Sequence, residues 1–384
     1  MNRRCEVLVV GGGPGGSTCA GRLARAGVDV LVIDRKTFPR DKICAGWVTP
    51  QVFDVLNIDP ADYGRAHVCQ PITGFRTGLI GQDEIDTDYG GVVSYGIRRC
   101  EFDHFLLERA GVECILGEAV TDLRRDGDGW IVNDHIRASV IVGAGGHFCP
   151  IARALGGREG DQIVTVAAQE LEFPIDPEQE SQIQLRGEIP ELYFCQDLAG
   201  YGWCFRKGNF LNIGLGRLNS PGVSAHVQSF CRFLSDRGKV RCEMPSRFHG
   251  HAYRIYERIA PKLVADGALF IGDAAGLAYP QSGEGIRPAV ESGLMAADVL
   301  IEARGKYRGH DLEPYSRAIA DRFGTPRQGA ISDRLPMAFL QFAARRLLTN
   351  RWFTRHVVLD RWFLHAETPA LSISQGAPDS CGVA

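Results

Sequence analysis

The N-terminal part of the chain alternates between apolar runs and a glycine-rich turn. Val7–Val10 is a continuous apolar run and Val28–Ile33 is apolar apart from Asp29, the pattern of strands that are buried on both faces of a parallel sheet. Between them, Gly11–Gly16 predicts a tight turn and Ser17–Ala26 a helix that ends at Gly27. This order of elements predicts one βαβ unit.

Two kinds of hydrophobic pattern follow. Ala268–Ile271 and Ile286–Ala303 repeat the buried strand and the helix of the N-terminal unit. Gln162–Tyr256 instead carries short alternating runs, typical of an antiparallel sheet, with one helix at Val223–Ser235. We therefore predict an α/β fold in which a Rossmann-type nucleotide-binding domain receives an inserted, largely antiparallel α+β substrate domain, with a helical C-terminal segment.

These shifts of pattern also predict domain boundaries and further elements. The nucleotide-binding domain takes residues 1–60, 96–160 and 266–305, the substrate domain 61–95 and 161–265, the C-terminal helical segment 306–370 and a disordered tail 371–384. Further strands are expected near 72–76, 92–95, 112–116, 182–185, 191–195 and 211–215, a helix at 102–110, and a hairpin over 130–142 that turns at Asn133–Asp134.

Composition narrows the class of protein. With 384 residues and 45% hydrophobic side chains the chain can bury a large core, and a formal net charge of −3 gives no reason to expect nucleic acid as a partner. No apolar run approaches the roughly 18 residues of a membrane span. The twelve cysteines form no Cys-x-x-Cys pair and no zinc-type cluster with histidine. We expect a cytoplasmic protein with reduced thiols and no metal.

The glycine-rich turn has the spacing of a dinucleotide site. Gly11, Gly13 and Gly16 fit Gly-x-Gly-x-x-Gly between a strand and a helix, so the helix N-terminus would face a pyrophosphate. Asp34 ends the next strand about 20 residues on, where a carboxylate accepts hydrogen bonds from a ribose. The structural alternative is an ordinary turn, which this combination of features disfavours.

A second motif near the C-terminal end distinguishes FAD from NAD. Asp273 follows the late strand, where it could bind a second hydroxyl-bearing part of the cofactor, although a helix N-cap is the simpler role for a lone aspartate. Gly283, Gly285 and Ile286 then open a helix whose N-terminus suits the flavin edge that gains negative charge on reduction.

Three sequence elements carry a resemblance to a known family. Arg99–Asp103 (Arg-Cys-Glu-Phe-Asp) is similar to an element of the flavin monooxygenase and halogenase superfamily. Phe38–Gly46 (Phe-Pro-Arg-Asp-Lys-Ile-Cys-Ala-Gly) and Tyr201–Lys207 (Tyr-Gly-Trp-Cys-Phe-Arg-Lys) resemble the narrower signatures of the FAD-dependent geranylgeranyl reductases. The resemblance covers roughly Cys5 to Ala303 and implies FAD and the hydrogenation of isolated double bonds in prenyl chains.

The same resemblance implies further cofactor contacts, and it has departures. It assigns FAD contacts also to Pro14, Gly15, Arg35, Cys44, Ala45, Arg99 and Val120. Ala45 stands where the family has glycine and Arg206 where it has proline, while Gly145–His147 replaces the Ala-Asp-Gly of many superfamily members. These departures do not affect the expectation that FAD binds, but they make the identity of the substrate less certain from the resemblance.

Fold alone does not choose the reaction. A reductase of carbon–carbon double bonds in a hydrophobic, isoprenoid-like substrate is favoured, with an aromatic monooxygenase as the alternative and a halogenase or a flavin electron-transfer partner behind it. A halogenase would show Trp-x-Trp-x-Ile-Pro, and the chain has one tryptophan there, Trp203. No second dinucleotide turn follows a later strand, so NAD(P)H or a reduced carrier protein must bring the electrons from outside.

Several side chains are candidates for this chemistry. Cys44 is the candidate catalytic residue, which would position or protonate the substrate. The alternative is that Cys44, as one of twelve cysteines, only packs in the core. Tyr201 and Trp203 would share one face of a strand and wall a substrate channel, or form ordinary core. The histidines 147, 249 and 251 could act in acid–base catalysis, although a role as polar loop or strand residues fits them better.

The C-terminal segment mixes aromatic and basic residues between Leu335 and His365. It could be an amphipathic cap over a lipid-like substrate or a surface in peripheral contact with a membrane. The favoured alternative is a pair of helices that pack on the core while their arginines reach solvent.

Overall fold

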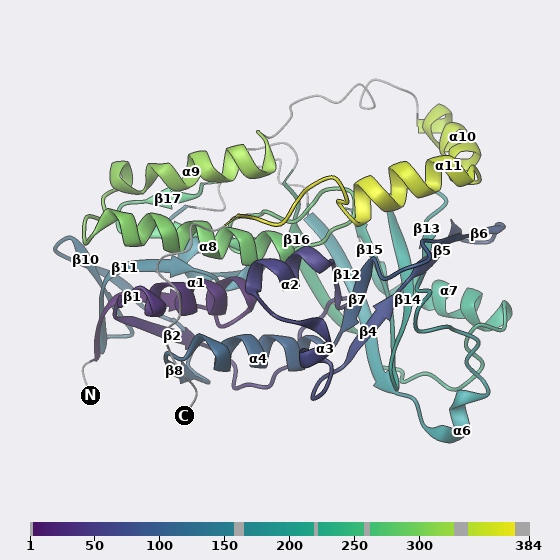
Figure 1. The fold of residues 1–384 in the computed structure, drawn as a ribbon, viewed down its shortest axis with the longest axis horizontal. Coiled ribbons are helices and arrows are strands. Elements are labelled where there is room, and N and C mark those ends of the chain that lie inside the picture. Colours follow the sequence, from purple (N-terminus) through teal and green to yellow (C-terminus); the bar gives the residue numbers. More distant parts are fainter. Residues whose placement is uncertain (1–2, 157–164, 219–221, 257–261, 326–336, 373–384) are drawn as a thin grey trace.

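The computed structural model describes residues 3–156, 165–218, 222–256, 262–325 and 337–372, with the backbone alone for 337–341. Within these residues the strands form three sheets. Two large sheets lie side by side along the long axis of the molecule (Figure 1). The N-terminal strands belong to one of them, and the C-terminal helices α10 (Met337–Leu347) and α11 (Arg351–Phe353) lie beside the other.

The first sheet has a parallel core built from the predicted apolar runs. Its order is β17-β18-β11-β1-β2-β8, and β10 and β9 extend it through antiparallel pairing on β11. The strand bounds are β1 (Arg3–Val10), β2 (Val30–Asp34), β8 (Glu113–Leu116), β9 (Leu123–Asp126), β10 (Gly129–Val132), β11 (Ile136–Gly143), β17 (Val264–Ala265) and β18 (Ala268–Phe270).

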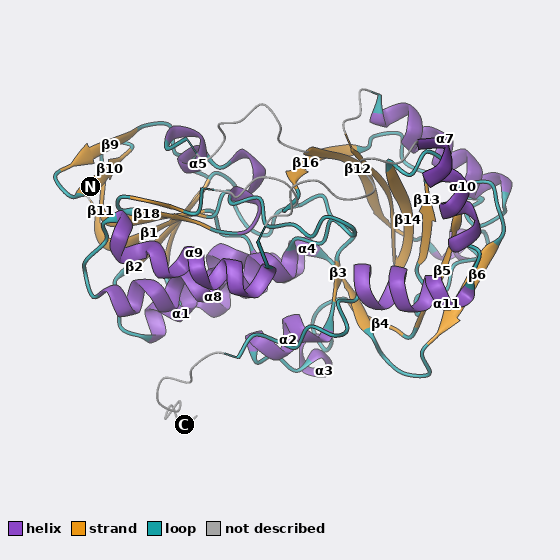
Figure 2. Cartoon of the chain, turned by 90° about the horizontal axis from the view of Figure 1, so that it is seen from above, coloured by secondary structure: helices purple, strands orange, loops and turns teal. Residues whose placement is uncertain are grey.

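Helices cover this sheet, and glycines let two of them approach closely (Figure 2). α1 (Pro14–Arg25) packs on α8 (Ile286–Ala303), where a Cβ added at Gly293 would lie 2.4 Å from the carbonyl oxygen of Gly15. The covering also includes α4 (Arg99–Ala110), α5 (Pro150–Ala154), α9 (Gly309–Phe323) and the 3-10 turns η1 (Gly146–Phe148) and η2 (Gly272–Ala274).

The second large sheet is antiparallel apart from one pair. Its order is β16-β12-β15-β14-β13-β5-β6, and only β13 and β5 run parallel. The strand bounds are β5 (Gly74–Leu79), β6 (Glu84–Asp88), β12 (Thr165–Pro174), β13 (Glu191–Phe194), β14 (Gly200–Lys207), β15 (Phe210–Leu218) and β16 (His249–Arg254). We call it the substrate sheet, because it contains the predicted substrate-binding strand.

The two faces of the substrate sheet bury different clusters. One face packs against α7 (Val223–Asp236) through side chains such as Leu211 and Ile213. The other face presents Trp203, Phe205 and Leu192 to a π-helix, η4 (Thr354–Phe363). Since neighbouring strand residues point to opposite faces, the alternation in the sequence separates the two clusters.

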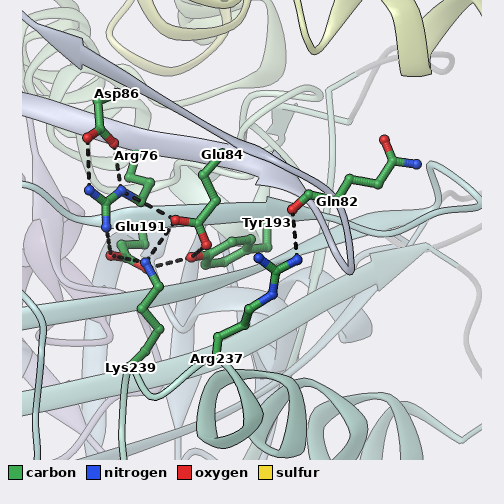
Figure 3. Close-up of polar contacts among 8 residues, drawn as sticks. All are labelled: Arg76, Gln82, Glu84, Asp86, Glu191, Tyr193, Arg237 and Lys239. Atoms are coloured by element: carbon green, nitrogen blue, oxygen red, sulfur yellow. Dashed lines mark hydrogen bonds and ion pairs between the residues drawn. The ribbon is translucent and has the colours of Figure 1, made fainter.

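A cluster of charged side chains connects Lys239 to strands β5, β6 and β13 at the β6 end of this sheet (Figure 3). Lys239 Nζ lies 2.8 Å from Glu84 and 3.2 Å from Glu191, and the Tyr193 hydroxyl donates to Glu191 at 2.5 Å. Arg76 pairs with Asp86 at 2.6 Å. Because each buried charge here has an opposite charge beside it, the cluster avoids the cost of an isolated buried ion.

A small sheet joins the two large ones. Its order is β3-β7-β4, with β3 (Trp47–Val48), β4 (Cys69–Ile72) and β7 (Ser94–Ile97). The short helices α2 (Pro50–Leu56) and α3 (Pro60–Tyr63) lie between β3 and β4 in the chain, and α6 (Pro177–Glu180) follows β12.

The structure confirms the α/β fold with its parallel nucleotide-binding sheet and separate antiparallel sheet, and α8 has the predicted bounds. The hairpin turn at Asn133–Asp134 is present, with positive φ at both residues. The strand predicted at 182–185 is wrong, because only the bridge Ile183–Val240 forms there. Ile183 and Leu185 are buried as the alternation requires, but they pack as a loop.

The segment 306–370 does not pack as one unit. The Tyr315 hydroxyl of α9 donates to the carbonyl oxygen of Phe270 in the nucleotide-binding sheet, whereas η4 packs on the substrate sheet. Of the tail predicted over 371–384, Leu371 packs against two cores, and residues from 373 onward lie outside the described part.

Candidate active site

The glycine-rich turn builds a cradle at the N-terminus of α1. Gly11 has φ +117°, and a Cβ there would lie 2.4 Å from the carbonyl oxygen of Ala144. A Cβ at Gly16 would lie 1.9 Å from the carbonyl oxygen of Gly11. At Gly13 the nearest atom to an added Cβ is the guanidinium of Arg40, at 3.4 Å. The turn is therefore closed on its protein side and flanked by a cation, as a pyrophosphate requires.

Asp34 stabilises this turn directly. Its Oδ2 accepts a hydrogen bond from the Gly12 amide and its Oδ1 one from the Lys36 amide, both at 2.8 Å. Arg35 follows, exposed, and the Glu118 amide donates to the carbonyl oxygen of Asp34, which brings the half-buried Val120 to the same edge. Ribose and adenine contacts at these three positions remain predictions.

The distal motif faces the substrate sheet. Asp273 lies in η2, and a Cβ added at Gly285 would be 3.0 Å from its Oδ1. A Cβ at Gly283 would lie 2.1 Å from the hydroxyl of Tyr253 on β16. Gly285 is the N-cap of α8 and carries no side-chain cap, so Ile286 begins a helix whose first amides lack a capping side chain. This is the geometry expected for a bound anionic edge of a cofactor.

Lys42 and His251 lie beside Asp273. Lys42 Nζ and His251 Nε2 are 2.6 Å apart, and His251 lies 3.9 Å from Asp273 Oδ2. Burial lowers the pKa of Lys42 to about 8 and also lowers that of His251. Burial alone would raise the pKa of Asp273, but His251 and Lys42 hold it below the usual value. Of the three candidate histidines, the structure brings His251 to the site.

Arg99 lies beside Cys44, in the loop Phe38–Gly46 that we call the Cys44 loop. Its guanidinium donates to both carboxylate oxygens of Asp103, at 2.8 and 2.9 Å, and Arg40 reaches the same carboxylate at 3.2 Å. Burial opposes the charge of Arg99, but Asp103 and Cys44 beside it raise its pKa. The predicted contact of Arg99 with the cofactor remains a prediction.

Glu170 of β12 holds the backbone of Cys44. The Cys44 amide donates to Glu170 Oε1 at 2.6 Å, and Asn212 Nδ2 donates to the Cys44 carbonyl oxygen at 3.3 Å. Glu170 is buried, and its Oε2 has no hydrogen-bond partner among the described residues. Burial raises the pKa of Glu170 to about 7.

The two reductase-like signatures meet at Lys207. This buried ammonium donates to the carbonyl oxygens of Ala45 and Ile97, each at 3.0 Å, and lies 2.5 Å from Glu172. A Cβ added at Gly46, where φ is +64°, would lie 2.7 Å from Lys207 Nζ. The Phe38–Gly46 and Tyr201–Lys207 elements are therefore one structural unit.

Aromatic side chains form a wall next to these groups. Trp203 Nε1 donates to Asn212 Oδ1 at 2.7 Å, and the Tyr201 hydroxyl donates to the carbonyl oxygen of Ser282. The ring of Phe363 from η4 lies 5.2 Å from that of Tyr201 and stacks on Trp47 at 5.5 Å. Tyr201 and Trp203 thus share one face, and η4 roofs it.

Glu284 is a buried carboxyl of the distal motif that the sequence did not single out. Neither of its carboxylate oxygens has a partner within the described ranges, and burial raises its pKa to about 8. The adjoining Tyr279 stacks on His365 at 3.8 Å, and burial lowers the pKa of that histidine to about 4.

Sequence reasoning missed Glu170, Lys207 and Asn212 as site residues. The available signal was two carboxylates at alternate positions, Glu170 and Glu172, within a strand whose other residues are mostly apolar. Such residues share a face, and buried charges are rare unless they are paired.

Comparison with known proteins matches the N-terminal region to one family model. Residues 4–58 match the family described as an FAD binding domain. In the described part of the chain, no helix has the length and apolar character needed to cross a membrane.

Two curated relatives align over most of the chain. Menaquinone reductase of Mycobacterium tuberculosis is 30% identical over 348 residues, covering 83% of this chain and 80% of the relative. Geranylgeranyl diphosphate reductase of Synechocystis is 28% identical over 347 residues, covering 83% of this chain and 82% of the relative.

A solved structure shares the fold. A geranylgeranyl bacteriochlorophyll reductase-like protein from Thermoplasma acidophilum superposes with a TM-score of 0.72 at 22% identity, covering 90% of this chain and 88% of that one.

Proposed function

The chain belongs to the geranylgeranyl reductase family of FAD-dependent oxidoreductases, and we propose that it reduces carbon–carbon double bonds of a hydrophobic, prenyl-bearing substrate. The observation that carries this proposal is the aromatic wall of Trp47, Tyr201 and Trp203, which directly adjoins the distal cofactor motif. The named substrates of the two relatives, a menaquinone and a geranylgeranyl diphosphate, share a prenyl chain, which such a wall would bind by apolar contact.

The residues that fit FAD lie in two groups. The Gly11–Gly16 turn with Arg40 suits the pyrophosphate, and Asp273 with the Gly283–Gly285 turn suits the flavin end. Bound FAD, reduced by an external donor, supplies the hydride that the double bond needs. NAD(P)H or a reduced carrier protein is the proposed donor, because the sequence has only one dinucleotide turn.

The second hydrogen of the reduced bond arrives as a proton. We assign its delivery to the thiol of Cys44, whose loop lies between the cofactor motifs and the aromatic wall. Glu170 holds the Cys44 amide, and its raised pKa keeps its own proton available near neutral pH. The proton would pass from the Cys44 Sγ to carbon. Because Glu170 Oε2 has no hydrogen-bond partner among the described residues, it would be available to turn toward the thiol and replace that proton, and solvent would then reprotonate Glu170.

The remaining residues orient and dry the site. Lys207 and Asn212 fix the carbonyl oxygens of Ala45 and Cys44, so the loop has one position. Phe363 covers Tyr201 and excludes water from the wall. Exclusion of water protects a hydride donor from side reactions.

Anaerobic turnover tests this function. The FAD-loaded protein is reduced with dithionite and mixed with a menaquinone or with geranylgeranyl diphosphate, and the flavin absorbance and the product mass are followed. We expect oxidation of the flavin by the prenyl compound and a product with two added hydrogens per reduced bond, located in the prenyl chain by fragmentation and not in the quinone ring. Flavin that stays reduced with both prenyl compounds, and that consumes oxygen and hydroxylates an aromatic compound once air is admitted, would overturn the proposal.

Cys44→Ala separates a chemical role from packing. If Cys44 delivers the proton, kcat falls by about 100-fold or more, while FAD remains bound because the Cys44 backbone contacts are kept. Cys100→Ala, at another half-buried thiol, is the matched control and should keep its activity. Unchanged kcat and KM in Cys44→Ala would remove the assignment.

A further inference from the structure

The segment 342–365 has an inner face that is fully engaged. Leu348, Val358, Leu359 and Phe363 are buried, and they pack against the aromatic face of the substrate sheet. The predicted packing of this segment on the core is therefore present on one side. The same segment covers the aromatic wall of Trp47, Tyr201 and Trp203.

The outer face of this segment exposes large apolar side chains. Trp352 is 66% exposed, Phe342 61% and Leu347 43%. Trp352 and Phe342 are the two most exposed large hydrophobic residues in the described part of the protein. Large apolar groups that gather on one surface mark an interaction site, whereas single ones need no explanation.

The same surface is strongly basic. Residues 342–365 contain five arginines, at 345, 346, 351, 355 and 361, and a single acidic residue, Asp360. That carboxylate is already bound by the Tyr89 hydroxyl at 2.5 Å and by His356 at 3.0 Å. Within the ranges that the structure describes, Arg345, Arg346 and Arg351 pair with no carboxylate. Since the whole chain is formally −3, this positive charge is local.

From these two observations we propose that the outer surface of α10 and α11, formed by Phe342, Arg345, Arg346, Leu347, Arg351 and Trp352, docks on the headgroup region of an anionic lipid bilayer. Exposed aromatic and leucine side chains beside arginines that lack a carboxylate partner in the described part of the chain are the composition of an interfacial surface. In such a surface, apolar groups enter the acyl boundary and arginines meet lipid phosphates. The proposal goes beyond the reaction, because it concerns where the enzyme sits.

The position of this surface gives the docking a use. Both views place α10 and α11 at the end of the long axis opposite β10 (Figures 1 and 2). The inner face of the same segment roofs the aromatic wall through Phe363. Docking therefore brings the segment that covers the aromatic wall to the lipid bilayer, in which a long apolar substrate is dissolved. The nucleotide-binding sheet stays on the water side.

Vesicle co-sedimentation of the full-length, FAD-loaded protein tests the docking without turnover, so its result does not depend on the proposed reaction. Vesicles of phosphatidylcholine alone are compared with vesicles that also contain phosphatidylglycerol. We expect binding to the anionic vesicles and its loss when salt is raised, because exposed ionic contacts are screened. Absence of binding to the anionic vesicles would overturn the proposal.

Two sets of substitutions locate the surface. Phe342→Ser/Leu347→Ser/Trp352→Ser should weaken binding at least about tenfold, and Arg345→Gln/Arg346→Gln/Arg351→Gln should abolish its salt dependence. Leu116→Ser/Leu218→Ser and Arg65→Gln/Arg186→Gln, at exposed positions on other elements, are the matched controls and should bind like the parent protein.

Two outcomes would contradict the assignment of this surface. One is vesicle binding that both sets of variants retain. The other is an oligomer of the parent protein that the triple apolar variant converts to monomer in gel filtration without lipid, because a second copy would then cover the surface. Retained FAD in each variant shows that it is folded.

Discussion

The nucleotide-binding sheet and the substrate sheet bury different side chains. In the first, β1, β2 and β11 bury continuous apolar runs, and the fit is set by glycines that touch backbone, such as Gly16 against Gly11. In the second, the strands bury Glu170, Glu191 and Lys207. Each of these charges has a named polar partner on a different segment.

The difference separates two ways of fixing a site. Close backbone contact fixes the Gly11–Gly16 turn, because a residue larger than glycine would not fit at its closest contacts. Paired buried charges fix the Cys44 loop, because an ion without its partner is costly in the interior. The following predictions test this contrast, from the largest expected effect to the smallest.

Gly16→Val tests the cradle. The Cβ would lie 1.9 Å from the carbonyl oxygen of Gly11, so the turn cannot keep its shape. We expect FAD affinity to fall about 100-fold or more, which corresponds to about 3 kcal/mol, as measured by titration of the apoprotein with FAD. Gly91→Ala, where nothing lies within 4 Å of the added Cβ, is the control. Retained affinity in Gly16→Val would show that close contact is not the constraint.

Lys207→Met tests the paired charges. It leaves Glu172 and the carbonyl oxygens of Ala45 and Ile97 without their shared donor. The free energy of unfolding should fall by about 3–5 kcal/mol, measured by urea denaturation. Lys207→Met/Glu172→Gln should recover part of that loss, because the second change removes a carboxylate charge that would keep only Arg98 and Asn212 as partners. Equal losses in both variants would contradict a charge-based role.

Glu170→Gln tests the proton supply at Cys44. Because burial raises the pKa of Glu170 to about 7, the parent rate should fall as pH rises above about 7, where this carboxyl loses its proton. The variant should lose this pH dependence, and its kcat should fall by about 100-fold, with FAD still bound. A variant that keeps the parent pH profile would exclude Glu170 as the source.

The raised pKa of Glu170 also makes the stability of the protein depend on pH. The folded protein holds this proton up to about pH 7, whereas the unfolded chain releases it near the usual value of 4.5. The folded state therefore binds more protons between these values, and stability decreases as pH rises through that window. Glu170→Gln should flatten this decrease, measured by thermal unfolding across the window.

Arg206→Gln should have the smallest effect. Arg206 pairs with Glu180 at 2.6 Å near the surface, and such pairs contribute about 0–1 kcal/mol. We expect a change in stability below about 1 kcal/mol in urea denaturation and unchanged FAD binding. A loss as large as that of Lys207→Met would place Arg206 with the buried charges.

The sequence was sufficient for features that depend on local spacing. The turn Gly11–Gly16, the hairpin at Asn133–Asp134 and helix α8 each follow from neighbouring residues, and the structure has them. The strand predicted at 182–185 failed, because burial of Ile183 and Leu185 imitates a strand without a ladder partner.

The contacts of the site depend on long-range register that no local pattern contains. Glu170 meets Cys44 across 126 positions, and Lys42 meets His251 across 209. These pairs form only after the antiparallel strands have aligned and the loop has packed on them. The contact of Lys207 with the carbonyl oxygen of Ala45 could not be predicted from the sequence for the same reason.

The return of the chain to the nucleotide-binding region after η4 matters for redesign of this enzyme. The guanidinium of Arg287, in the first turn of α8, donates to the carbonyl oxygens of Thr368 and Pro369, and Leu371 packs beyond them. Glu291 accepts from the same guanidinium. A truncation before Thr368 would remove the other two acceptors of this buried cation and disturb the first turn of α8, which belongs to the distal cofactor motif.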